Sequence, residues 1–328
     1  MRPLTLHAAI EHWPLVTPFR ITGHMWKVLE VLVVGLAKDG YVGRGEAAGV
    51  YYKNDKPISM IKQIESVRPL IEAGASLDAL QRMLPPGGAR NALDCAFWDL
   101  EAKTSDRPAW QIAGLEKPRP LITTYTCGAD EPEKMAATAR AYASARAMKL
   151  KLTGEPIDAQ RVRAVRESRG DVWLSVDANQ GFTRAHLEWL MPVLVEARVA
   201  LIEQPFPVGD EALLDSFQSP IPIAADESVQ IVSDIPGLVG RFNVVNIKLD
   251  KCGGLTEGLA MAQTAREVGL ETMVGNMLGT SLAMAPAFLL GQLCDVVDLD
   301  GPIFLKADRA VRAQYADGFI ICPETIWG

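Results

Sequence analysis

The first third of the chain has the hydrophobic pattern of a mixed α+β domain. Residues 28–37 are apolar and β-branched, Lys38-Asp39-Gly40 is typical of a tight turn, and a second strand is predicted from Tyr41 onward. After Pro57 the apolar spacing becomes helical, which predicts one helix over 57–73 and another over 89–103. We therefore predict an α+β domain over residues 1–117.

From about residue 120, short apolar strands alternate with amphipathic helical stretches. Eight strands with seven intervening helices can be recognised: LITTYTCG, MKLKL, VWLSVDAN, ALIEQP, PIAADES, VVNIKLD, ETMVGN and DVVDLDG. This alternation predicts a parallel sheet, and eight units favour a closed α/β barrel over residues 118–308. An open doubly wound sheet is the alternative, but it would need a Gly-rich phosphate loop that we do not find. The tail, 309–328, should return to the first domain.

Composition and charge restrict the class of protein. The 328 residues are 48% hydrophobic and 22% charged, and the net charge of -7 argues against nucleic acid or an anionic membrane as the main partner. Five scattered cysteines without a CxxC pair indicate reduced thiols. Neither a signal peptide nor an apolar run of roughly 18 residues is found, so we expect a soluble, cytoplasmic protein.

Polar residues follow the predicted strands at regular intervals. Because the carboxyl ends of barrel strands form the usual active-site face, these side chains should ring one mouth of the barrel. They are Lys149 and Lys151 on strand two, Asp177 and Asn179 on strand three, Glu203 on strand four, Asp226 and Glu227 on strand five, Lys248 on strand six, and Asp298 and Asp300 on strand eight.

Three successive strands place Asp177, Glu203 and Asp226 in one arc of this ring. Unneutralised carboxylates so close together would raise one another's pKa values. A hard cation such as Mg²⁺ would resolve the repulsion, since it takes oxygen ligands and leaves positions open for a substrate. The structural alternative is that each acid caps the helix after its strand.

Two lysines would face each other across the mouth. Strands two and six are opposite in a ring of eight, so Lys151 and Lys248 could address the two faces of a substrate, one removing a proton and the other returning it. Lys149 would lower the pKa of Lys151 and steady a substrate carboxylate. The alternative for Lys149 and Lys151 is a solvated strand face. Asp298 and Asp300 could grip an ammonium group, or simply form the turn before Gly301-Pro302.

The ordered set of motifs resembles the muconate-lactonizing-enzyme subgroup of the enolase superfamily. The motifs are Lys149-Leu-Lys151, Asp177-Ala-Asn179, Glu203-Gln-Pro205, Asp226-Glu-Ser228 and Lys248-Leu-Asp250-Lys251-Cys-Gly253-Gly254, and the helix over 89–100 is similar to the subgroup's capping-domain helix. The resemblance implies an α+β capping domain over a (β/α)7β TIM-like barrel. It also implies Mg²⁺ on Asp177, Glu203 and Asp226, supported by Asn179, with Lys151 and Lys248 as the acid/base pair.

Within that subgroup, Asp298-Leu-Asp300-Gly-Pro looks like the dipeptide epimerases, where such a pair binds the substrate's α-ammonium. Relatives that act on Ala-Glu carry a cation in an N-terminal loop for the glutamate side chain; Arg20 and His24 are the candidates here. We therefore expect a Mg²⁺-dependent epimerase of dipeptides such as L-Ala-D/L-Glu, acting through a metal-stabilised enolate, and a homo-oligomer would be compatible with this.

Other functions remain open at this stage. The same machinery could serve N-acylamino-acid racemisation, o-succinylbenzoate synthesis or muconate cycloisomerisation, none of which needs an ammonium grip. A pyridoxal-phosphate enzyme with a Schiff-base lysine and a non-enzymatic binding protein are the more distant alternatives.

Overall fold

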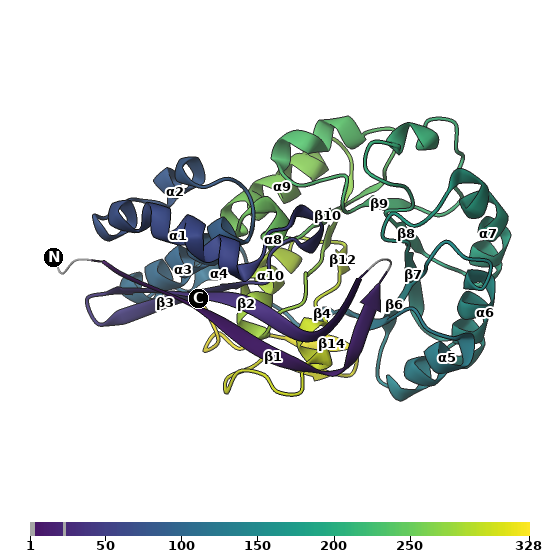
Figure 1. The fold of residues 1–328 in the computed structure, drawn as a ribbon, viewed down its shortest axis with the longest axis horizontal. Helices are drawn as coiled ribbons and strands as arrows, with labels where there is room; N and C mark the ends of the chain where they lie inside the picture. The colour runs from purple at the N-terminus through teal and green to yellow at the C-terminus, as the bar shows by residue number, and fades with distance from the viewer. Residues whose placement is uncertain (1–3, 22–23) are drawn as a thin grey trace.

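The computed structural model describes residues 4–21 and 24–328, and they form two parts (Figure 1). An antiparallel sheet with helices α1–α4 on it forms the N-terminal part, and a ring of parallel strands with outer helices forms the rest. The strands are β1 (Thr5–Ile21), β2 (His24–Lys38), β3 (Tyr41–Ala47), β4 (Leu121–Ile122), β5 (Thr124–Cys127), β6 (Ala147–Lys151), β7 (Trp173–Asp177), β8 (Leu201–Glu203), β9 (Ile223–Ala225), β10 (Val244–Ile247), β11 (Glu271–Val274), β12 (Val296–Val297), β13 (Gln314–Ala316) and β14 (Phe319–Ile321). The α-helices are α1 (Pro57–Glu72), α2 (Leu77–Met83), α3 (Gly88–Ser105), α4 (Ala109–Ile112), α5 (Pro132–Ala141), α6 (Asp158–Ser168), α7 (Arg184–Glu196), α8 (Leu249–Cys252), α9 (Leu255–Glu267) and α10 (Ser281–Gly291).

The predicted hairpin is confirmed as β2 and β3, joined at Asp39 and Gly40, which both have positive φ. A long strand, β1, precedes them and pairs with β2. Its register shifts between Pro14 and Phe19, because proline cannot donate to a ladder, and this irregularity hid the strand from the pattern. The far ends of β1 and β2 reach the barrel mouth (Figure 1).

The barrel is confirmed by its strand order, which runs without interruption from β12 to β5. A doubly wound sheet would reverse its order at a switch point, so that alternative is wrong. Side chains of β5 and the preceding residue link the two ends of the ring: Thr124 Oγ1 donates to Asp298, and Leu299 N donates to Thr123 Oγ1 at 2.9 Å.

The prediction of seven intervening helices is wrong at two crossovers. The connections after β8 and β9 contain only 3₁₀ turns, η2 (Glu211–Leu214) and η3 (Val232–Leu238), among the residues described there. Proline and glycine explain this, since η3 contains Pro236-Gly237 and the segment before β9 contains several prolines. Two further 3₁₀ turns, η1 (Tyr51–Lys53) and η4 (Gly301–Phe304), border the barrel mouth.

Helix α3 packs directly on β3 because β3 carries glycines at the contact. A Cβ at Gly43 or Gly45 would overlap the backbone oxygens of Ala96 and Ala92. The helix backbone can therefore approach the sheet closely, and its other side reaches the barrel at α8 and α9.

The C-terminal tail contacts both parts of the molecule. Strand β14 pairs with β4, just before the barrel begins. Farther along, Trp327 Nε1 donates to Cys95 O at 3.0 Å, and Gly328 N donates to Asp99 Oδ1 at 2.8 Å, so the chain end is held against α3.

All five cysteines are free, three buried and two half-buried, as the sequence predicted for reduced thiols. Among the described residues, none of the helices has the length and apolar character needed to cross a membrane.

Candidate active site

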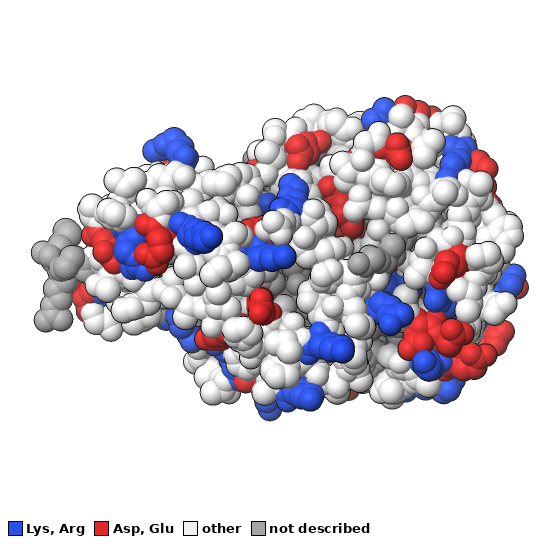
Figure 2. Space-filling view, viewed as in Figure 1, with Lys and Arg blue, Asp and Glu red and all other residues white. Residues whose placement is uncertain are grey.

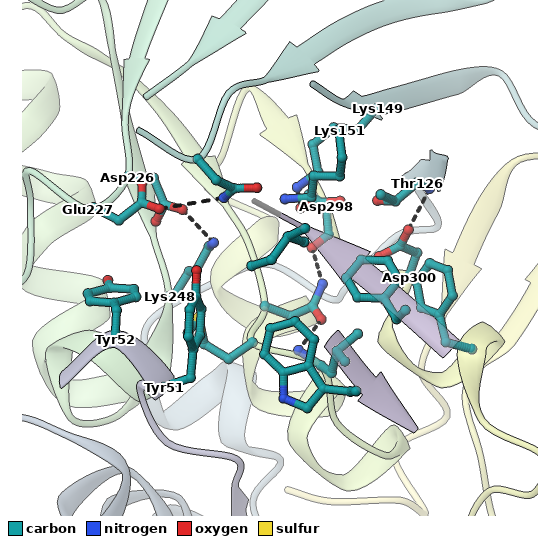
Figure 3. Close-up of a pocket in the computed structure, with 18 residues that line it drawn as sticks. Tyr51, Tyr52, Thr126, Lys149, Lys151, Asp226, Glu227, Lys248, Asp298 and Asp300 are labelled. Carbon is teal, nitrogen blue, oxygen red and sulfur yellow. Dashed lines mark hydrogen bonds and ion pairs between the residues drawn. The ribbon is translucent and has the colours of Figure 1, made fainter. Parts of the chain in front are cut away.

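The two lysines of strand β6, Lys149 and Lys151, point into the barrel. Met148 and Leu150 point outward into the main hydrophobic core, whereas Lys149 and Lys151 point inward and are only 3% and 6% exposed. A solvated strand face would leave both ammonium groups in water, so that alternative is wrong. Lys149, Lys151 and Lys248 line the same pocket at the mouth of the barrel (Figure 3).

Each of these lysines is paired with carboxylates. Lys149 Nζ contacts Asp298 and lies 3.7 Å from Glu203 Oε2. Lys151 Nζ bonds the Asp177 carboxylate, and Lys248 Nζ donates to Asp226 Oδ2 at 2.7 Å.

The carboxylates raise the pKa of two of these lysines, Lys149 and Lys248. Burial would lower the pKa of Lys149, but Asp298, Glu203 and Asp177 together raise it. The pKa of Lys248 is likewise raised, because Asp226, Glu203 and Glu227 outweigh the effect of burial. Lys149 is therefore protonated and positively charged in the folded protein.

The three expected metal ligands lie on adjacent strands, as predicted. Asp177 and Glu203 are register partners on β7 and β8, Asp226 follows β9, and all three are buried. Burial and the charge of Asp177 raise the pKa of Glu203 to about 7. The pKa of Asp226 is lowered despite its burial, because Lys248 and Lys251 hold its charge. The carboxylates of Asp177 and Asp226 form ion pairs with lysines, whereas the structural alternative required each acid to cap the helix after its strand.

The donor set suits a hard divalent cation. The mouth contains six buried carboxylates, Asp177, Glu203, Asp226, Glu227, Asp298 and Asp300, against four buried lysines, Lys149, Lys151, Lys248 and Lys251. Glu203 Oε2 and Asn179 Oδ1 are buried without a hydrogen-bond partner. Within the described residues, however, no group of three or more acidic, cysteine or histidine side chains is arranged to hold a metal as it stands, because lysines engage the carboxylates. The carboxylate and amide oxygens of this set, two of them without a partner, are nevertheless the ligand types that Mg²⁺ takes in proteins, so the residues present fit this ion.

Asp298 and Asp300 both enter the pocket from the residues after β12 (Figure 3). Asp298 binds Lys149 and Thr124, and Asp300 Oδ2 accepts from Thr126 N at 2.7 Å. Burial and the neighbouring Asp298 raise the pKa of Asp300 to about 6. Asp300 precedes the η4 turn but does not cap it with its side chain, so side-chain capping of that turn does not account for Asp300.

Arg20 and His24 do not line the central pocket. Arg20 borders an adjoining cleft of about 590 Å³ with Asp130 and Lys134, where acidic and basic side chains gather over α5 (Figure 2). His24 is exposed, and its ring packs at a tilt of 58° against that of Trp26, with ring centroids 4.1 Å apart.

Sequence reasoning missed several residues at this site. Tyr51 and Tyr52 belong to η1, a three-residue turn with no periodic signal, and they line the pocket beside Lys248. Lys251 Nζ donates to Asp226 Oδ1 at 2.7 Å, and its place inside the quoted Lys-x-Asp-Lys motif was the available signal. Glu227, by contrast, was expected at the mouth; it lines the pocket, and one of its oxygens is buried without a hydrogen-bond partner.

Comparison with known proteins agrees with this geometry. Residues 4–114 match the family model for the mandelate racemase / muconate lactonizing enzyme N-terminal domain, and residues 134–325 match the enolase C-terminal domain-like model. The chain belongs to the enolase superfamily. Its relatives make it an isomerase of the racemase and epimerase type.

Curated relatives of this enolase-superfamily member include two at 40% identity. The L-Ala-D/L-Glu epimerase of Escherichia coli aligns over 94% of this chain and 96% of its own length. The N-acetyl-D-glutamate racemase of a Pseudoalteromonas species aligns over 91% and 95%.

Solved structures share the whole fold. An enolase family member from Agrobacterium tumefaciens with homology to dipeptide epimerases, solved with sodium and L-Ala-L-Glu, has a TM-score of 0.96 and 37% identity, covering 99% of this chain and 100% of its own. A dipeptide epimerase from Methylococcus capsulatus, complexed with Mg and L-Arg-D-Lys, has a TM-score of 0.91 and 29% identity, covering 98% of both chains.

Proposed function

We propose that the protein is a Mg²⁺-dependent dipeptide epimerase that inverts the α-carbon of the C-terminal residue, with L-Ala-D/L-Glu as the first substrate to test. The observation that carries this proposal is the burial of Lys151, on strand β6, and Lys248, directly after strand β10, both lining one pocket. Three strands separate β6 from β10 along the ring, so the two amines approach a bound substrate from opposite sides.

The two lysines would exchange roles with the direction of the reaction. One, as the neutral amine, takes the proton from the α-carbon, and the other, as ammonium, delivers a proton to the opposite face. The product then leaves each lysine in the protonation state that suits the reverse reaction. Lys149, held as a cation by Asp298, would bind the substrate carboxylate.

Asp177, Glu203 and Asp226 would hold Mg²⁺, with the Asn179 side chain, which donates to Asp177 Oδ2 at 3.3 Å, orienting that ligand. Bound there, Mg²⁺ would supply positive charge to offset the negative charge that develops when the α-proton leaves. With Asp177 and Asp226 engaged in this way, the amines of Lys151 and Lys248 would no longer be paired with them and could face the substrate.

The pair Asp298 and Asp300 favours a dipeptide over an N-acylated amino acid. An α-ammonium group would neutralise these buried carboxylates, whereas an acyl group would leave them without a cation beyond Lys149. N-acylamino-acid racemisation is the second candidate, supported by the similarity to the N-acetyl-D-glutamate racemase.

Incubation with a dipeptide library and matching N-acetylated amino acids in D₂O tests the proposal. We expect deuterium at the α-carbon of the C-terminal residue of dipeptides, loss of exchange in EDTA, and recovery with Mg²⁺. Exchange confined to the N-acetylated compounds would overturn the assignment of dipeptides as substrates. Exchange unaffected by EDTA would overturn the proposed dependence on Mg²⁺.

A further inference from the structure

The pocket has one wall to which the proposed reaction has not yet given a role. If the proposed function holds, the substrate carboxylate lies by Lys149 and the ammonium group by Asp298 and Asp300. The side chain of the epimerised residue would then extend toward the rest of the lining. The capping-domain wall of this lining includes Ile21, Trp26, Tyr51 and Tyr52, and Figure 3 shows the two tyrosines beside Lys248.

This wall offers no cation for an acidic side chain. Among the described residues that line the pocket, the cations are Lys149, Lys151 and Lys248, all of which contact carboxylates. Arg20 and His24, which flank the tip of the β1–β2 hairpin, do not line this pocket. A glutamate side chain would therefore need neutral hydrogen-bond donors, because an unpartnered buried carboxylate is costly.

Two phenol hydroxyls are available for this purpose. Tyr52 Oη accepts a hydrogen bond from Gln230 Nε2 at 3.2 Å, which leaves its own hydrogen to be donated. Burial, reinforced by nearby Glu227 and Asp226, raises the pKa of both tyrosines, so the two hydroxyls stay protonated at any working pH.

The rings are held in place by their neighbours. Tyr51 packs edge-on against Tyr52 at 5.1 Å and against Trp26 at 5.2 Å between ring centroids. The loop that carries them is tied to the barrel, because Gly49 N donates to Asp250 Oδ1 at 2.7 Å. Asp250 follows Lys248 by two residues, so the phenols are fixed relative to an acid/base lysine.

We propose that Tyr51 and Tyr52 determine specificity by donating hydroxyl hydrogen bonds to an acceptor group on the side chain of the epimerised residue, in place of an ion pair. The carboxylate of glutamate and the carbonyl of glutamine both fit this chemistry. Lys248 favours a negative group at this place, whereas Glu227, Asp226 and Asp177 oppose one, so glutamine should be taken at least as efficiently as glutamate.

Steady-state kinetics on three dipeptides test the assignment. The wild-type protein should epimerise L-Ala-L-Glu and L-Ala-L-Gln with kcat/KM values within about tenfold of each other. Tyr51→Phe and Tyr52→Phe keep the ring and remove the hydroxyl, so each should lower the ratio of kcat/KM for L-Ala-L-Glu to that for L-Ala-L-Met by about tenfold or more. Tyr41→Phe, at an exposed tyrosine on the β2–β3 hairpin, is the matched control.

The outcomes separate this inference from the function on which it rests. An unchanged ratio in both phenylalanine variants, or a wild-type preference for L-Ala-L-Met over both polar dipeptides, would overturn the role of the tyrosines and leave the epimerase intact. Absence of exchange from all three dipeptides in the wild-type protein would overturn the proposed function, and the tyrosine assignment with it.

Discussion

At the residue scale, the site is a set of buried charges that neutralise one another. Lys149 is nearly enclosed and touches two carboxylates, those of Asp298 and Glu203. A buried ion pair adds little stability overall, but removal of one partner leaves an uncompensated charge. Lys149 therefore matters to the fold as well as to the chemistry.

Replacing Lys149 with methionine should destabilise the protein, because Asp298 and Glu203 lose their shared cation. We expect the free energy of unfolding to fall by about 3 kcal/mol in urea denaturation at neutral pH. Lys62→Met, at an exposed lysine of α1, should change it by less than about 0.5 kcal/mol. Equal stability of the Lys149→Met and wild-type proteins would show that this charge is not needed to offset its neighbours.

Sequence could predict the residues whose positions depend on strand alternation. Lys149 and Lys151 face the same way because alternate residues of a strand do, and they proved to be buried together. Arg20 and His24 could not be placed, because the register shift between Pro14 and Phe19 hides the paired ends of β1 and β2, and both lie outside the central pocket. Tyr51 and Tyr52 were missed because a three-residue turn has no period.

At the element scale, helix α3 joins the capping domain to the barrel. Its glycine-lined contact with β3 is matched on the other side by Asp94, which accepts from Thr256 N at 3.2 Å at the start of α9. Sequence predicted the long helices and the ring of strands, since their periods extend over many residues. It did not predict the two 3₁₀ crossovers or strand β1, where prolines interrupt the pattern.

Gly45→Ala should separate α3 from β3, because the added Cβ would overlap the carbonyl of Ala92. We expect a loss of about 3 kcal/mol in the free energy of unfolding. Gly35→Ala on β2 is the control, since its nearest neighbour, Val42 Cγ1, is 3.7 Å away, an ordinary contact. If both variants were equally stable, close approach of the helix would not explain the glycine.

Asp94 should make stability depend on pH. Burial raises its pKa from 3.8 to about 6, so between pH 4 and pH 6 the folded state keeps a proton that the unfolded state has lost. Its contribution is fully present below pH 4 and is lost as the pH rises to 6, by about 3 kcal/mol. Asp94→Asn should remove this decline, as measured by urea denaturation across the window. An unchanged pH slope in the variant would contradict the assignment.

At the scale of the whole molecule, the proposed chemistry exists only because the barrel closes. Lys151, on strand β6, and Lys248, directly after strand β10, are 97 positions apart in sequence, yet they line one pocket beneath the capping domain. The tail strengthens this assembly by binding β4 at one end and α3 at the other. The spacing of the motifs along the sequence was sufficient to predict the two opposed lysines. The wall that carries Tyr51 and Tyr52, by contrast, depends on packing between the capping domain and the barrel.

In the proposed mechanism, Lys151 and Lys248 act on opposite faces of one α-carbon. The most direct measurement is deuterium incorporation in D₂O from each stereoisomer of L-Ala-Glu by the Lys151→Ala and Lys248→Ala proteins, with Lys62→Ala as control. Each variant should lose epimerisation by at least about 10³-fold and retain exchange from one stereoisomer, the two variants retaining opposite ones. Full epimerisation by either variant, or retention of the same stereoisomer by both, would contradict the two-lysine mechanism.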